Sequence, residues 1–105
     1  MTNRDPEFGP EEELQDVLRQ VHIYEALSNA ASDAHAVLDL MLTAADPSAA
    51  NRTLMDRYAF SEVQAWAVSE LQFRRMTAEA RTKIEQRHDE LRKRIEDLER
   101  QLGRA

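Results

Sequence analysis

The sequence predicts an all-α protein in which a long antiparallel two-helix coiled-coil arm is capped by a small helical dimerisation head. The 105 residues include two glycines and three prolines, and Pro47 is the one strong helix breaker between Glu11 and Leu102. Two long stretches repeat apolar residues at alternating spacings of four and three, which is typical of coiled coils. A chain of this length forms one domain with a small core.

The first arm helix is predicted over residues 11–43, after a flexible amino-terminal segment at residues 1–10. Pro10 suits a first helical position, and the three glutamates that follow it favour the amino-terminal end of a helix dipole. The stripe of this helix consists of Val17, Val21, Tyr24, Ser28, Ala31, His35, Leu38 and Leu42.

The head is predicted over residues 46–76. Asp46 can cap a short helix that begins at Pro47 and ends near Tyr58. A further helix follows from Phe60 to Met76, and Ser61 and Gln64 stand in the positions of a capping box.

This further helix has two apolar faces. At about 100° per residue, one face is predicted to serve the core and contains Phe60, Val63, Ala67 and Leu71. Trp66 and Phe73 lie nearly opposite, and we expect them to meet their own copies across a twofold axis, because tryptophan is enriched at interface hot spots. The predicted dimer contact consists of Trp66, Phe73, Ser69, Glu70 and Met76.

The second arm helix is predicted over residues 78–102, with Thr77 as its cap and Gly103 after its end. Its stripe consists of Ile84, His88, Leu91, Ile95, Leu98 and Leu102. Thr77 and Arg81 extend this stripe backwards, and antiparallel pairing with the first stripe gives eight pairs whose residue numbers add to 119, among them Val21 with Leu98. His35 and His88 then occupy adjacent layers, where we expect packed histidines and no metal, because a third ligand is missing.

Composition and charge exclude several classes of protein. There is no cysteine for a thiolate metal site, no apolar run near the roughly 20 residues of a membrane span, and no apolar signal-peptide core, so we expect a cytoplasmic protein without a cofactor. The net charge of -6 is the wrong sign for DNA binding. Arg74 and Arg75 are the candidate phosphate contacts, although pairing with Glu70 or Glu79 is the more frequent use of such residues.

The segment FSEVQAWAVSELQFRRMT resembles the stretch LSEIQAQAILDMRLRRLT of the A subunit of bacterial DNA gyrase and related type IIA topoisomerases. VHIYEAL is similar to the family's RxHILEGL, and ARTKIEQRHDELRKRIEDLERQL to its ascending arm. The resemblance covers residues 11–102. It implies the coiled-coil arms and the head that closes the exit gate, or C-gate, by dimerisation. Trp66 stands where the family commonly has glutamine, and Phe73 where it has leucine.

The resemblance also implies that the chain does not cleave DNA, because the family's catalytic tyrosine lies on a winged-helix domain that nothing here matches. Neither Tyr24 nor Tyr58 corresponds to it. We therefore expect a free-standing homodimeric gate-like module, with the DNA gyrase A subunit as a candidate partner. The alternative is a DNA-associated clamp or architectural protein that encloses a duplex between its arms. A small helical enzyme of the chorismate mutase type ranks last, because the first helix offers only Arg19 for an anionic substrate.

Overall fold

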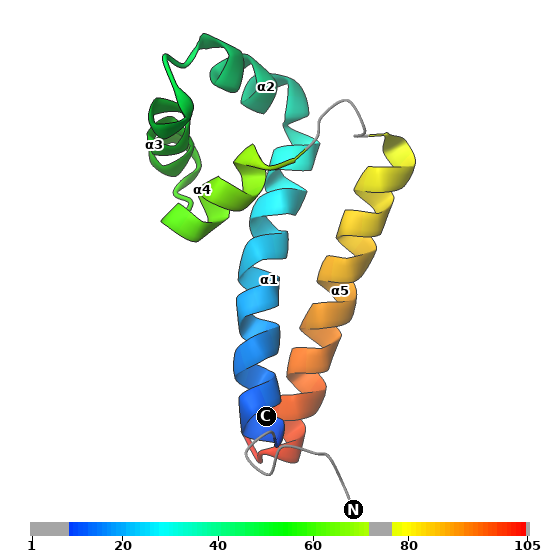
Figure 1. Cartoon of the computed structure of the whole chain (residues 1–105). Helices are drawn as coiled ribbons and strands as arrows, with labels where there is room; N and C mark the ends of the chain where they lie inside the picture. Colours follow the sequence, from blue (N-terminus) through cyan, green and yellow to red (C-terminus); the bar gives the residue numbers. More distant parts are fainter. Residues whose placement is uncertain (1–8, 72–76, 105) are drawn as a thin grey trace, which may run out of the picture.

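A computed structural model of the chain describes residues 9–71 and 77–104, which contain five helices (Figure 1). They are α1 (Pro10–Ser32), α2 (Ala34–Thr43), α3 (Pro47–Tyr58), α4 (Glu62–Ser69) and α5 (Ala78–Gln101). Helices α1 and α5 lie side by side in opposite directions, and α2, α3 and α4 form a head at one end of the pair. The predicted all-α class is confirmed. Among the described residues, no helix is both long and apolar enough to cross a membrane.

The ends of the helices follow from short-range chemistry. Asp46 caps α3 by accepting a hydrogen bond from the Ala49 N–H at 2.8 Å, and Thr77 caps α5 by accepting one from the Ala80 N–H at 3.1 Å. Helix α5 gives way to Leu102 and Gly103, and the φ angle of Gly103 is 72°. Glycine adopts this left-handed conformation readily, so the helix stops where the sequence predicts.

The predicted continuous helix over residues 11–43 is wrong, because the structure interrupts it at Asp33. The backbone of Asp33 leaves the helical region, with φ of -124° and ψ of 37°. The Ser32 hydroxyl donates to the Asn29 carbonyl at 2.9 Å, and the Tyr58 hydroxyl donates to the Asp33 carboxylate at 2.7 Å. The bond from Ser32 competes with the helical ones, the bond from Tyr58 ties the interruption to the end of α3, and the chain turns so that α2 joins the head.

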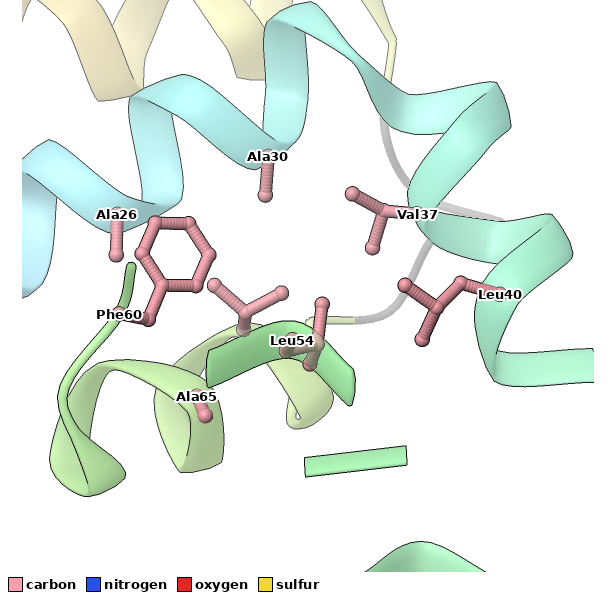
Figure 2. Packing of buried hydrophobic residues seen from close by; sticks show 8 residues of the cluster. Ala26, Ala30, Val37, Leu40, Leu54, Phe60 and Ala65 are labelled. Carbon is pink, nitrogen blue, oxygen red and sulfur yellow. The ribbon is translucent and has the colours of Figure 1, made fainter. Parts of the chain in front are cut away.

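The head has its own apolar core, to which all four helices α1 to α4 contribute (Figure 2). Its buried members are Ala26, Ala30, Val37, Leu40, Leu54, Phe60, Ala65 and Val68. Tyr58 stacks on Phe60 with ring centroids 5.2 Å apart. The second half of the predicted arm therefore belongs to the head: Leu38 is 38% exposed and Leu42 is 75% exposed, so these two stripe residues are not buried against α5.

A second apolar cluster holds α1 against α5. Its buried members are Leu14, Val17, Val21, Leu91 and Leu98, and Tyr24, Ile95 and Leu102 pack against them. The amino-terminal half of the first predicted stripe therefore packs against the carboxyl-terminal half of the second, as predicted.

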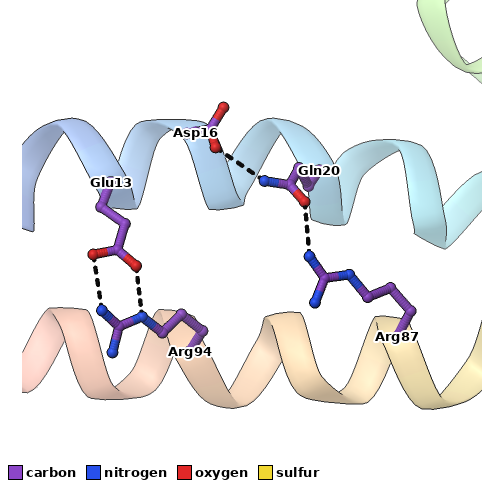
Figure 3. A network of polar contacts seen from close by, with 5 residues as sticks. All are labelled: Glu13, Asp16, Gln20, Arg87 and Arg94. Atoms are coloured by element: carbon purple, nitrogen blue, oxygen red, sulfur yellow. Dashed lines mark hydrogen bonds and ion pairs between the residues drawn. The ribbon is translucent and has the colours of Figure 1, made fainter.

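The alignment of the two helices differs from the predicted one by a heptad. On one flank Glu13 pairs with Arg94 and Gln20 with Arg87, so their residue numbers add to 107 (Figure 3). On the other flank the carboxylate of Glu25 lies 3.8 Å from Arg92, and these numbers add to 117. The apolar residues that face each other between the two flanks therefore have residue numbers that add to 112, midway between 107 and 117. The predicted sum is 119. Both alignments keep apolar residues in the seam, and the polar flanks together with Leu14, absent from the predicted stripe, favour the observed one.

Candidate interaction surface of the head

Helix α4 begins with the predicted capping box. The Ser61 hydroxyl oxygen accepts a hydrogen bond from the Gln64 N–H at 3.1 Å, and the Ser61 N–H donates to Gln64 Oε1 at 2.9 Å. Ala59, with φ of 57°, makes the turn from α3, and Phe60 lies in the non-helical segment before the cap. The cap thus fixes where α4 starts and which side chains it exposes.

The inner face of α4 differs from the predicted one. Gln64, Ala65 and Val68 are buried, whereas Val63, which we predicted in the core, is 58% exposed. The prediction counted Phe60 as part of the helix and so placed the face in the wrong direction. Phe60 is buried nevertheless, because the segment before the cap carries it into the head core.

Trp66 lies on the outer face of α4, as predicted, and is 60% exposed. Val63 is one helical turn away on the same side. Ser69 is half-buried and its hydroxyl donates to the Trp66 carbonyl at 2.7 Å, while Glu70 is exposed just after the helix. We call the surface formed by Glu62, Val63, Trp66 and Glu70 the outer face of α4. The other predicted contacts, Phe73 and Met76, and the candidate phosphate contacts, Arg74 and Arg75, lie outside the described residues.

A shallow groove between α1 and α4 continues from Val63. Its volume is about 480 Å³, and it is lined by Gln15, Leu18, Arg19, His22, Ile23, Ser61 and Val63. Leu18 is 40% exposed there. The exposed apolar surface around α4 therefore includes Leu18 and Val63 in addition to Trp66.

The junction between α1 and α4 contains residues whose contact the sequence did not reveal. His22 Nε2 lies 2.8 Å from the Ser61 hydroxyl oxygen, and Gln64 Nε2 donates to the His22 carbonyl at 2.7 Å. All three residues fall within the two segments that carry the family resemblance. The sequence thus indicates these residues through their place in those two segments, but it does not reveal which of them touch.

Charges are complementary between the acidic α1 and the more basic α5. Arg94 donates two hydrogen bonds to the Glu13 carboxylate, from Nε at 2.7 Å and from Nη2 at 2.8 Å. These bonds lower the pKa of Glu13 and raise the pKa of Arg94. At the end of the pair away from the head, Arg104 donates to Glu11 at 2.6 Å. The ion pairs fix the alignment of the helices more than they add to stability, because they are exposed.

The two tyrosines have packing roles. Tyr24 lies against the cluster between α1 and α5, and Tyr58 lies against the head core. Burial and the hydrogen bond to Asp33 raise the pKa of Tyr58, which keeps its hydroxyl protonated.

The predicted adjacency of His35 and His88 is wrong. His35 is exposed on α2, beyond the interruption at Asp33, while the observed alignment places His88 opposite Tyr24. Nε2 of His88 is buried without a hydrogen-bond partner among the described residues. Within residues 9–71 and 77–104, no three potential ligands from histidine, aspartate and glutamate come close enough to hold a metal ion.

The chain is similar to known proteins over nearly all of its length. The profile of the family described as the A subunit of DNA gyrase/topoisomerase IV matches residues 10–105. The DNA gyrase A subunit of Synechocystis sp. is 37% identical over 92 residues, which are 88% of this chain and 11% of that protein. The DNA gyrase A subunit of Helicobacter pylori is 33% identical over 86 residues, 82% of this chain and 10% of that protein. The DNA topoisomerase 4 A subunit of Bacillus subtilis is 36% identical over 87 residues, 83% and 11% respectively. The chain thus spans about a tenth of the length of these curated relatives.

Proposed function

The chain belongs to the family of DNA gyrase and topoisomerase IV A subunits, and we propose that it acts as a C-gate-like module that pairs with a second copy through its head. In this proposal α1 and α5 form a coiled-coil arm, and the head closes the gate. The chain does not cleave DNA by itself and takes part in DNA topology by associating with gyrase.

The arrangement of α1 and α5 supports the coiled-coil part of this proposal. Apolar residues of both helices alternate at spacings of three and four and are gathered in one cluster. Polar pairs lie on both flanks of that cluster, with Glu13 and Arg94 on one side and Glu25 and Arg92 on the other. Flanking charge pairs of this kind set partner and alignment in coiled coils.

The observation that carries the self-association is the outer face of α4. Trp66 and Val63 are each more than half exposed on one side of a short helix, at the end of the arm where the head lies. Exposed tryptophan is a frequent anchor of protein interfaces. A stable interface buries about 800 Å² per partner, so we propose that Ser69, Glu70 and the predicted Phe73 and Met76 extend the contact.

The roles of the two tyrosines support the absence of cleavage by this chain alone. Tyr24 and Tyr58 are packing residues, and the Tyr58 hydroxyl is engaged with Asp33. A tyrosine nucleophile must lose its proton. The raised pKa of Tyr58 opposes this loss.

A substitution of Trp66 tests the proposed dimer. Sedimentation and native mass measurements over a range of concentrations should give a dimer for the wild-type chain. Trp66→Ser should raise the dissociation constant about 30-fold or more, because hot-spot residues contribute at least about 2 kcal/mol. Leu42→Ser is the matched control, since it removes an exposed apolar side chain of α2, which is 75% exposed. A wild-type chain that stays monomeric, or a Leu42→Ser variant that alone dissociates, contradicts the proposal.

Mixing the chain with the DNA gyrase A subunit tests the association with gyrase. A native mass spectrum should show a mixed species that contains one copy of each, and Trp66→Ser should reduce its amount together with the amount of the homodimer. Homodimers without any mixed species would restrict the proposal to self-association.

A further inference from the structure

Three polar residues tie α4 to the middle of α1. His22 Nε2 lies 2.8 Å from Ser61 Oγ, and Gln64 Nε2 donates to the His22 carbonyl oxygen at 2.7 Å. Ser61 and Gln64 also bond to each other through the capping box. We call His22, Ser61 and Gln64 the latch. It is a closed ring of hydrogen bonds between parts of the chain that are 39 and 42 residues apart.

The surroundings of the latch make it stiff. Gln64 is only 7% exposed, and its side-chain amide bonds to the His22 carbonyl and the Ser61 N–H, so movement of α4 away from α1 would cost the buried amide its bond to His22. Ala26 and Ala30 of α1 and Ala65 of α4 are fully buried in the same core (Figure 2). Their small side chains let the two helices approach closely, so that little free volume remains for movement.

The interruption at Asp33 is also held. The Tyr58 hydroxyl donates to the Asp33 carboxylate at 2.7 Å, which links the point where α1 gives way to α2 with the end of α3. Val37 of α2 and Leu54 of α3 are both fully buried. The non-helical residue between α1 and α2 is therefore fixed by a tertiary contact and does not act as a free hinge.

The first half of α5 is attached much less firmly. Between Ala78 and Arg87 every residue is exposed except Ala80 and Ile84, which are half-buried. The buried residues of α5 are Leu91 and Leu98, towards its carboxyl end. The ribbons of α1 and α5 also diverge towards the head (Figure 1). Segments with few buried apolar contacts open at lower free energy than the packed parts of a structure.

We propose that α1 and the head move as one rigid body fastened by the latch, and that the first half of α5 up to the Gln20–Arg87 hydrogen bond, residues 78–86, is the element that moves. It pivots on the contacts that Leu91 and Leu98 make with α1. The distance between the two long helices at the head end then changes by displacement of α5 and not by swinging of the head. This inference concerns motion within one chain and does not depend on the proposed dimer.

Distances between spin labels test the division into a fixed and a moving part. The chain has no cysteine, so labels can be placed at will. Arg19→Cys with Arg52→Cys joins α1 to the head, and Arg19→Cys with Lys83→Cys joins α1 to the first half of α5; all three positions are exposed. Labelled chains are diluted into unlabelled protein so that only distances within one chain are measured. We expect a narrow distribution for the first pair and a broad one for the second. A first distribution as broad as the second overturns the proposal.

Latch variants test the cause of the rigidity. The double variant His22→Ala, Gln64→Met removes both hydrogen bonds between α1 and α4. It should broaden the distribution between α1 and the head, and leave that between α1 and α5 unchanged. Amide hydrogen exchange at residues 62–69 should become about tenfold faster. His35→Ala, at the exposed histidine of α2, is the matched control and should change neither measurement.

The single variant Gln64→Met removes the bond of the buried amide to α1 and carries the same test if the double variant fails to fold. Unchanged exchange at residues 62–69 in a folded latch variant overturns the proposal, as does an equal effect of His35→Ala.

Discussion

Replacing Leu14 by alanine tests how α1 and α5 are aligned. Leu14 is 2% exposed and belongs to the same apolar cluster as Leu98, which it faces in the observed alignment. In the alignment predicted from the stripes, it would face position 105, which lies beyond the predicted arm helix at residues 78–102, and would gain little burial. The two alignments therefore predict different free energies of unfolding for Leu14→Ala.

The expected loss follows from the burial. The substitution removes three carbon atoms, each worth about 0.8 kcal/mol, or about 2.4 kcal/mol together. A residual cavity adds to this, so that leucine-to-alanine changes in cores range over about 2–5 kcal/mol. A chain of this length has a total stability of about 5–15 kcal/mol. The loss is therefore a large fraction of the free energy that keeps the chain folded.

Urea unfolding followed by circular dichroism measures this loss. All variants are compared at one protein concentration, because self-association adds to the apparent stability. Leu42→Ala is the matched control: it removes the same atoms from a side chain that is 75% exposed, and should change the stability by less than about 0.5 kcal/mol. A loss for Leu14→Ala no larger than that of Leu42→Ala would refute the observed alignment.

Three further predictions concern polar contacts. Because Arg94 lowers the pKa of Glu13 from 4.5, their ion pair stabilises the fold above that value, and its contribution is lost as the pH falls through the lowered pKa. Glu13→Gln should thus be less stable than wild type at pH 7, and the difference in urea unfolding should shrink towards pH 2; a constant difference contradicts this. Tyr58→Phe removes the hydrogen bond to Asp33 and should lose about 1 kcal/mol in urea unfolding at pH 7. Since the pKa of Tyr58 is raised from 10.0, this contribution is present below that value and lost as the pH rises through the raised pKa. If the free energies of unfolding of variant and wild type change with alkaline pH in the same way, this contribution is excluded. Ser61→Ala removes the cap of α4 and should lower the melting temperature by about 4–8 °C, which corresponds to about 1 kcal/mol; an unchanged melting temperature would show that the cap contributes nothing.

The sequence predicts the helix ends well because their chemistry is local. The Asp46 cap, the Thr77 cap and the Ser61–Gln64 capping box each join residues that are three apart. A pattern of this kind can be read directly from neighbouring letters. The interruption at Asp33 cannot, because its partner Tyr58 is 25 residues away and reaches it only once the head has folded.

The alignment of α1 with α5 could not be predicted from the apolar residues for a different reason. Apolar stripes with a heptad repeat fit each other equally well after a shift of seven residues, so the stripes alone leave several alignments open. The polar flanks distinguish them: Gln20 faces Arg87, and Glu13 faces Arg94 one heptad further on. The flanking residues therefore carry the information that the apolar stripe lacks.

For α4 the sequence predicts the wrong inner face but the right side for Trp66, which is exposed. Phe60 precedes the cap, so it has no place on the helical wheel, and the buried residues Ala65 and Val68 define the inner face instead. Trp66 lies opposite that inner face and also off the predicted one, which is why its exposure agrees with the prediction. Val63 moves from the core to the same outer side. A contact centred on Trp66 would thus gain an aliphatic neighbour one turn away, and the proposed self-association would rest on described residues even without Phe73.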